Sequence, residues 1–248
     1  MPIRYQLAFY EKQAKRIFFY TISKLRRFTF DKRTYRYFYH PYNQTWQNER
    51  AIEVPIIWRE IKKKEGRILE VGNVLSHYYP VQHDIVDKHE EGPTVTNVDI
   101  CNFDTSKDYD LIVSISTFEH VCYDELVAIS TIEHDAYDYD ELTCKAQASA
   151  EAAICVFEEP VRNAIENLKS HLSQAGEIII TVPLGYNPAL DRLLKEEKIF
   201  TDIKYLKRVS KDNMWREAYD TEIRNVRYDW QYRHANVLAV CVFQRIQK

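Results

Sequence analysis

Residues 67–72 read Arg67-Ile-Leu-Glu-Val-Gly72, a short apolar run that ends at a glycine and is followed by Asn73. Such a run, closed by turn-forming residues, is typical of a buried strand. Helical periodicity at 56–64, 161–172 and 188–197 flanks or separates further runs of this kind. Continuous apolar runs that alternate with helices indicate a mainly parallel sheet covered on both faces. We expect its other strands at residues 83–87, 96–100, 110–117, 176–183, 204–210 and 236–243.

The composition indicates an ordinary globular protein, with 45% hydrophobic and 29% charged residues. The sequence has no run of ~18 apolar residues that would span a membrane. Only 5 of 248 residues are glycine, and no P-loop motif is present. The five cysteines are odd in number and form no C-x-x-C pair, which argues against a disulfide framework or a zinc knuckle. The N-terminal residues lack the pattern of a secretory signal, and we therefore expect no such signal and a cytoplasmic protein.

The residues that follow the expected strands are candidates for a binding site. Ligands of parallel α/β sheets bind outside the carboxyl ends of the strands, where the strand order reverses. Acidic residues stand near three successive strand ends, which favours a shared cleft. The alternative is that each aspartate caps the helix that follows it. The residues at these strand ends are Glu70, Gly72, Asn73, Asp87, Asp99, Ser116, Glu119 and His120.

Taken together, these motifs resemble the class I S-adenosylmethionine-dependent methyltransferases. The resemblance rests on Ile68-Leu-Glu-Val-Gly72, on the acidic residues after the next two strands, and on Tyr109-Asp-Leu-Ile-Val with Phe-Glu-His-Val121. The last piece, and the strand at 176–183, are similar to the small-molecule branch of that family. The resemblance covers about residues 60–245. It implies an α/β, Rossmann-like sheet of seven mainly parallel strands with helices on both faces and an antiparallel last strand.

The resemblance also implies S-adenosylmethionine as the cofactor. The backbone at Gly72 would approach the methionine part, and Glu70 would orient that loop. Asp87 would accept both ribose hydroxyls, and Asp99 would accept the adenine amino group, with Ile100 against the ring. The candidate cofactor-binding residues are Glu70, Gly72, Asn73, Asp87, Asp99, Ile100 and Ser116.

The loop after the first strand departs from the family pattern. It reads Glu70-Val-Gly-Asn-Val-Leu-Ser76, where the family usually has two further glycines. Close approach of the backbone to a ligand is therefore available only at Gly72.

His120 is the candidate catalytic base, because imidazole titrates near neutral pH, and Glu119 would assist it or orient the loop. A structural role for this histidine, capping a helix, is the alternative. The segment 115–126 recurs at 129–142, and we assign the first copy to the end of the strand 110–117. No pair of histidines has i, i+4 spacing, and we expect no metal site.

The first 58 residues differ from the rest in charge. Residues 1–50 carry 11 Lys or Arg and 3 Asp or Glu, whereas residues 99–142 carry 12 acidic residues and one lysine. The apolar residues between 7 and 30 predict a basic amphipathic helix that packs on the core or, alternatively, contacts a membrane surface weakly.

The aromatic segment 34–50 is expected to be an ordered loop. We expect residues 1–58 to form an extension rather than an independent domain, and 59–248 to form the methyltransferase-like domain. The extension would close over the acceptor as a lid, through Tyr39, His40, Tyr42 and Trp46.

Three functions fit these observations. The first is methyl transfer to an oxygen or nitrogen of a small molecule, a glycan or a secondary-metabolite unit. The second is a methyltransferase-like binding protein without catalysis, which the missing glycines favour. The third, a nucleic-acid methyltransferase, ranks last because no Asn- or Asp-Pro-Pro-Tyr motif follows the strand at 110–117.

Overall fold

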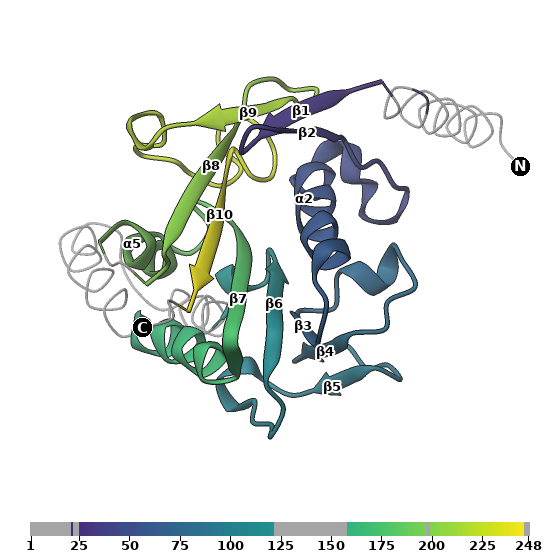
Figure 1. The fold of residues 1–248 in the computed structure, drawn as a ribbon. Coiled ribbons are helices and arrows are strands. Elements are labelled where there is room, and N and C mark those ends of the chain that lie inside the picture. Colours follow the sequence, from purple (N-terminus) through teal and green to yellow (C-terminus); the bar gives the residue numbers. More distant parts are fainter. Residues whose placement is uncertain (1–20, 22–24, 122–157, 197–198, 246–248) are drawn as a thin grey trace, which may run out of the picture.

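An eight-stranded sheet forms the centre of the structure (Figure 1). The computed structural model describes residues 21, 25–121, 158–196 and 199–245. The strand order is β5-β4-β3-β6-β7-β10-β8-β9. In that order the strands are β5 (Val95–Asn97), β4 (Asp84–Asp87), β3 (Ile68–Val71), β6 (Tyr109–Ile115), β7 (Leu172–Pro183), β10 (Val237–Gln244), β8 (Asp202–Arg208) and β9 (Trp215–Ala218).

The sheet is parallel from β5 to β7, and β10 lies antiparallel between β7 and β8. The prediction of a mainly parallel sheet with an antiparallel last strand is confirmed. The expected count of seven strands is wrong, because β9 pairs antiparallel with β8 at the edge. The strand order reverses between β3 and β6, since β4 and β5 extend the sheet one way and β6 and β7 the other.

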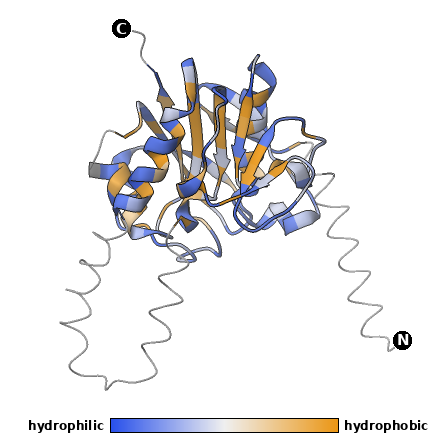
Figure 2. Cartoon of the chain, turned by 90° about the horizontal axis from the view of Figure 1, so that it is seen from below, coloured by the Kyte–Doolittle hydropathy of each residue, from blue (hydrophilic) through white to orange (hydrophobic). Residues whose placement is uncertain are grey.

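The central strands are buried on both faces, which explains their continuous apolar sequences. Leu111, Val113 and Ile115 of β6 belong to one buried cluster, while Ile112 belongs to the other. Figure 2 shows hydrophobic residues concentrated in the strands of the sheet.

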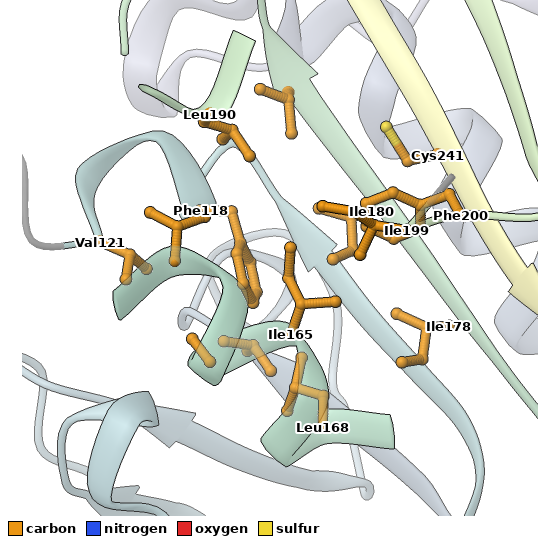
Figure 3. Close-up of a cluster of buried hydrophobic side chains, with 14 of the residues drawn as sticks. Phe118, Val121, Ile165, Leu168, Ile178, Ile180, Leu190, Ile199, Phe200 and Cys241 are labelled. Atoms are coloured by element: carbon orange, nitrogen blue, oxygen red, sulfur yellow. The ribbon is translucent and has the colours of Figure 1, made fainter. Parts of the chain in front are cut away.

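Helices cover both faces of the sheet (Figure 1). Helix α2 (Arg50–Lys63) packs on one face, and a helix over residues 158–170 packs on the other with α5 (Pro188–Glu196). Figure 3 shows Ile165 and Leu168 of the 158–170 helix against Ile178 and Ile180 of β7. Among the described residues, no helix combines the length and apolar character needed to cross a membrane.

Residues 27–36 form a hairpin, β1 (Arg27–Phe30) and β2 (Arg33–Arg36), so the helix expected up to residue 30 is wrong over this part. The remainder of that expected helix, apart from residues 21, 25 and 26, lies outside the described residues. Asp31 and Lys32 both have positive φ, 50° and 59°, which is the geometry of a two-residue hairpin turn. The lack of glycine at this turn made the hairpin hard to recognise in the sequence.

The chain after β2 is tied to α2 by a main-chain hydrogen bond. Pro55 lies inside α2 and has no N–H, so the carbonyl of Ala51 lacks its usual partner within the helix. The amide of Phe38 donates to that carbonyl at 2.8 Å. Helix α2 begins at Arg50, six residues before the expected start, and the expected boundary between residues 58 and 59 falls inside it.

The other strands and helices begin and end within a few residues of the boundaries expected from the sequence. Strand β5 ends at Asn97, so Asp99 comes two residues after the strand rather than near its last residue. Strand β7 begins at Leu172, where the sequence predicted the end of a helix. Ile115 ends β6, as the assignment of the first repeat copy predicts, and the second copy lies outside the described residues.

A candidate cofactor-binding pocket

A pocket of about 600 Å³ opens at the carboxyl ends of β3, β4 and β6, where the strand order reverses. Five of the seven candidate cofactor-binding residues line it, and so does the candidate base His120. The lining residues are Val71, Gly72, Val86, Asp87, Lys88, His89, Glu90, Val98, Asp99, Ile100, Ser116, Thr117, His120 and Val121.

Glu70 does not line the pocket but holds the loop that does. Its side chain is fully buried, and Oε1 accepts hydrogen bonds from the amides of Val74 at 3.0 Å and Leu75 at 2.8 Å. Its other oxygen, Oε2, lies 2.7 Å from Nε2 of His83. The carboxylate therefore orients the loop from beneath.

At Gly72 the backbone of this loop lies against Thr117. Gly72 has a φ of 85°, and an added Cβ would lie 2.1 Å from Oγ1 of Thr117. Neither Val74 nor Ser76, which stand where the family pattern has its two further glycines, has a positive φ. The backbone therefore turns with a single glycine, and the two missing glycines are not needed for the conformation of the loop.

Asp87 ends β4, and its carboxylate already accepts hydrogen bonds from main-chain amides. Oδ2 accepts from the amide of Asn73 at 2.8 Å, and Oδ1 accepts from His89 at 2.8 Å and Glu90 at 2.7 Å. A carboxylate offers about four acceptor positions, so one remains for a ligand hydroxyl. Two ribose hydroxyls on Asp87 would require one of these amides to move.

Asp99 caps the 3₁₀ turn Ile100–Asn102, so the alternative of a capping aspartate is also realised. Its Oδ1 accepts from the amide of Cys101 at 2.9 Å, and Oδ2 lies 3.0 Å from Nζ of Lys88. Burial raises the pKa of Asp99, but the bonds from Cys101 and Lys88 outweigh it and lower the pKa below its usual value. Lys88, which the sequence reasoning missed, thus shares the pocket wall with Asp99.

Apolar side chains line the same pocket as these carboxylates. Ile100 is buried, and Val71, Val86, Val98 and Val121 line the same pocket. Apolar walls with a few polar groups at fixed places are typical of nucleoside and cofactor sites. The residues present therefore fit an adenine ring against Ile100, with polar groups at both ends.

His120 also lines the pocket and lies in the 3₁₀ turn Phe118–His120 after β6. Its side chain is 45% exposed, and Nε2 lies 3.9 Å from Oε1 of Glu119. Its ring makes an edge contact with Tyr186, with 4.8 Å between ring centroids.

Glu119, the other candidate catalytic residue, is buried and does not line the pocket. Its Oε2 has no hydrogen-bond partner among the described residues. Burial raises the pKa of Glu119 well above its usual value, and the charge of Glu53 raises it further.

Behind the pocket, Glu119 belongs to a buried acidic cluster, which we define as Glu49, Arg50, Glu53 and Glu119. Arg50 Nη1 donates to Glu53 Oε2 at 2.7 Å. Ser116, a pocket residue with a φ of 39°, donates to Glu53 Oε1 at 2.5 Å. The pKa of Glu49 is raised by burial and by the charge of Glu53.

Sequence reasoning missed this cluster. The available signal was Glu53, on a helix that is otherwise apolar on its buried side, with Glu49 at the N-cap of that helix.

The four candidate lid residues do not line the pocket. Tyr39 is buried in the core with Tyr35 and Tyr37, because alternate residues of an extended segment face the same side. The alternation Tyr35, Tyr37, Tyr39 is the sequence signal for this, and reading 34–50 as a loop hid it.

The other three lie outside the pocket as well. His40 contacts Tyr78 edge-on, and Trp46 packs against the core cluster. Tyr42 stacks on His77 at 4.5 Å, and His77 Nε2 lies 2.9 Å from Glu90 on the pocket rim. Tyr42 is thus linked to the pocket rim through His77.

No group of three or more His, Cys, Asp or Glu is arranged to hold a metal ion in the described part of the chain. No protein-family model matches the sequence, and no curated protein does.

Solved structures do resemble the fold. The N-methyltransferase NodS of Bradyrhizobium japonicum, in complex with S-adenosylhomocysteine, has a TM-score of 0.43 and 12% identity, over 80% of this chain and 88% of that chain. A possible histamine N-methyltransferase of Thermotoga maritima has a TM-score of 0.38 and 12% identity, over 76% and 87% of the two chains. A Thermotoga maritima O-methyltransferase has a TM-score of 0.37 and 13% identity, over 78% and 65%.

Five parallel strands reverse their order between β3 and β6, and the last strand lies antiparallel between β7 and β8. The described part of the chain has the mainly parallel, Rossmann-like sheet with an antiparallel last strand that the sequence resemblance to the class I S-adenosylmethionine-dependent methyltransferases implies, with β9 added at its edge.

Proposed function

We propose that this chain binds S-adenosylmethionine in the pocket between Gly72 and His120 and transfers its methyl group to an oxygen or nitrogen of a small molecule. The observation that carries this proposal is the pocket at the reversal of strand order, lined by Gly72, Asp87, Asp99 and Ile100. These residues come from three different strand ends, and each offers the contact that one part of the cofactor requires.

The parts of the cofactor can be assigned to these residues. Ile100 and the valines of the wall would pack on adenine, and Asp99 would accept the adenine amino group, with Lys88 displaced or shared. Asp87 has an acceptor position for a ribose hydroxyl. When bound, S-adenosylmethionine supplies an activated methyl group on a sulfonium.

His120 would remove the proton of the acceptor. It lies at the pocket wall, and nearly half of its side chain is exposed to solvent, so an acceptor can reach it. A positioned base near neutral pH contributes about 10²–10⁴-fold to a proton transfer. The chain would further lower the barrier by holding acceptor and methyl group in line.

The test is titration calorimetry with S-adenosylhomocysteine on the wild type and on Asp99→Asn. We expect saturable binding by the wild type. The variant should bind about tenfold more weakly, because it loses one hydrogen bond to a charged acceptor, worth ~1.5 kcal/mol. Asp104→Asn is the matched control, since Asp104 is exposed and lies outside the pocket. Absence of binding at millimolar ligand would contradict the proposal.

The second candidate is a binding protein without methyl transfer. The observation that favours it is that both carboxylates are already engaged: Asp87 by three amides, and Asp99 by the amide of Cys101 and by Lys88. Tight binding of S-adenosylhomocysteine together with unaltered S-adenosylmethionine after incubation with a broad set of small amines and alcohols would select this candidate.

A further inference from the structure

The connection between β3 and β4 carries the loop that borders the candidate cofactor pocket, and it contains little regular structure. Parallel strands are usually joined by a crossover that contains an α-helix. Here residues 72–83 contain only the 3₁₀ turn Leu75–His77. The hydrogen bonds of a long helix therefore do not hold the loop after Gly72, and other groups have to do so.

Three successive amides of this loop donate to carboxylates instead. The amide of Asn73 donates to Asp87 at 2.8 Å, and the amides of Val74 and Leu75 donate to Oε1 of Glu70 at 3.0 and 2.8 Å. Asp87 lines the pocket, whereas Glu70 does not line it and is fully buried. The conformation of the loop thus depends on where the carboxylate of Glu70 points.

His83 holds that carboxylate from its other side. It stands immediately before β4, and its Nε2 lies 2.7 Å from Oε2 of Glu70. An ionised carboxylate only accepts hydrogen bonds, so Nε2 is the donor. The side chain of His83 is 7% exposed and that of Glu70 is 0% exposed, so water has little access to replace this donor. A buried carboxylate oxygen that loses its donor is costly.

The imidazole of His83 also borders a second pocket. This pocket, of about 760 Å³, lies at the amino ends of β3 and β4, where Arg67, Ile68, His83 and Asp84 are among its lining residues. It shares no lining residue with the pocket at the carboxyl ends of the strands. Removal of the His83 side chain would therefore open the buried carboxylate of Glu70 to the second pocket.

We propose that His83 is a positioning residue for the cofactor: by donating to Glu70, it holds residues 72–75 in the conformation that binds S-adenosylmethionine. This inference rests on the proposed function and adds a residue to its binding site. His83 does not line the cofactor pocket, so it acts only through Glu70 and the amides of Val74 and Leu75.

Replacement of His83 by residues with and without a donor tests this role. His83→Leu has no donor, and S-adenosylhomocysteine should bind it about tenfold more weakly in titration calorimetry, because Oε2 of Glu70 loses its partner and the loop is released. His83→Gln offers a side-chain amide to the same oxygen and should keep the affinity within about threefold of the wild type.

His83→Ala allows rescue by a small molecule. The missing ring leaves a space that opens to the second pocket, so free imidazole can enter and donate to Glu70 in its place. We expect imidazole in the buffer to restore most of the affinity that His83→Ala loses and to leave the affinity of the wild type unchanged. Rescue distinguishes a hydrogen bond to Glu70 from a general contribution of His83 to stability.

His171 provides the matched control. It stands immediately before β7, another strand of the parallel part of the sheet, and it is 9% exposed. Its Nε2 has no hydrogen-bond partner among the described residues. His171→Leu and His171→Ala should keep the wild-type affinity, with or without imidazole. Melting curves verify that all variants are folded.

Amide hydrogen exchange of residues 73–79 measures the loop without any ligand. In His83→Leu these amides should exchange about tenfold faster than in the wild type, because the loop opens more often. His83→Gln and His171→Leu should retain exchange rates close to those of the wild type.

The outcomes separate the two proposals. Wild-type affinity and wild-type exchange rates in His83→Leu would overturn the positioning role and leave the cofactor site standing. Equal losses in His83→Leu and His83→Gln, without rescue of His83→Ala by imidazole, would also overturn it, because the ring would then act by its shape alone. Failure of the wild type to bind S-adenosylhomocysteine would overturn the proposed function and the cofactor part of this inference, while the exchange rates would still show whether His83 holds the loop.

Discussion

Asp191, in the first turn of α5, shows how burial of one carboxyl group makes stability depend on pH. Its Oδ2 accepts from the amide of Gly185 at 2.7 Å, and Oδ1 has no partner among the described residues. Burial raises the pKa of Asp191 to about 6, against opposing contributions from the Gly185 amide and Lys195. The bond to Gly185 holds the loop that carries Tyr186 beside His120.

The folded state binds the Asp191 proton more tightly than the unfolded state, because the pKa of about 6 lies above the ordinary 3.8. Stability from this group is therefore greatest in acid and falls as the pH rises from about 4 to about 6. Between pH 5 and pH 7.5 the ionisation of Asp191 should lower the free energy of unfolding of the wild type by ~1.4 kcal/mol. Asp191→Asn stays neutral and keeps an acceptor for Gly185, so this loss should be absent.

Urea unfolding at the two pH values measures the Asp191 effect. The exposed Asp104→Asn serves as control and should follow the wild type. If Asp191→Asn shows the same difference between pH 5 and pH 7.5 as the wild type, the carboxyl is already ionised at pH 5.

At the scale of elements, a single arginine side chain forms hydrogen bonds to three connecting segments around β8. Arg208 ends β8 and is 5% exposed. Its guanidinium donates to four main-chain carbonyls between 2.7 and 3.1 Å. These carbonyls belong to Gln47, Ser210, Lys211 and Arg233. One side chain thus joins the segment before α2, the turn before β9 and the loop before β10.

Arg208→Lys should therefore destabilise the chain by about 2–4 kcal/mol, because an ammonium cannot reach carbonyls in four directions and leaves buried acceptors unpaired. Arg216→Lys is the matched substitution at an exposed arginine that pairs with Glu222, and its effect on the melting temperature should be small. Equal shifts of the melting temperature in the two variants would mean that Arg208 contributes no more to stability than an exposed arginine does.

For the molecule as a whole, the N-terminal hairpin of β1 and β2, with Tyr37 directly after it, is part of the hydrophobic core. Phe28, Phe30, Tyr35 and Tyr37 are all buried in one cluster with α2 and with Val240 of β10. Replacing one such large aromatic residue by alanine typically costs ~3–5 kcal/mol. A hairpin that carries several of them contributes a large part of a domain's ~5–15 kcal/mol.

Deletion of residues 1–45 should therefore lower the unfolding midpoint of the whole chain rather than remove only a lid. Chemical denaturation followed by circular dichroism measures this. As a control, Leu25→Ser alters a residue of the same segment that is 77% exposed and should leave the midpoint near that of the wild type. An unchanged midpoint after the deletion would show that the hairpin is dispensable for the core.

Much of the sheet was predictable from the sequence, and so was the position of the pocket. Strands β3, β4, β6, β7 and β10 were recognisable because strands buried on both faces must be continuous apolar runs. Given a parallel sheet, the side chains after β3, β4 and β6 have to meet at one edge, which is why Gly72, Asp87 and His120 line one pocket.

What those side chains bond to was decided only by the tertiary structure. Asp99 pairs with Lys88, and Ser116 with Glu53, which is 63 positions away in the sequence. Tyr39 faces the core rather than the pocket. Residue types and spacing determine which groups reach an edge of the sheet, but hydrogen-bond partners and burial depend on distant segments brought together by packing. For this reason the sequence alone predicted that a binding site lies at the carboxyl edge of the sheet. The buried acidic cluster behind that site depends on the packing of α2 against β6, which the sequence did not show.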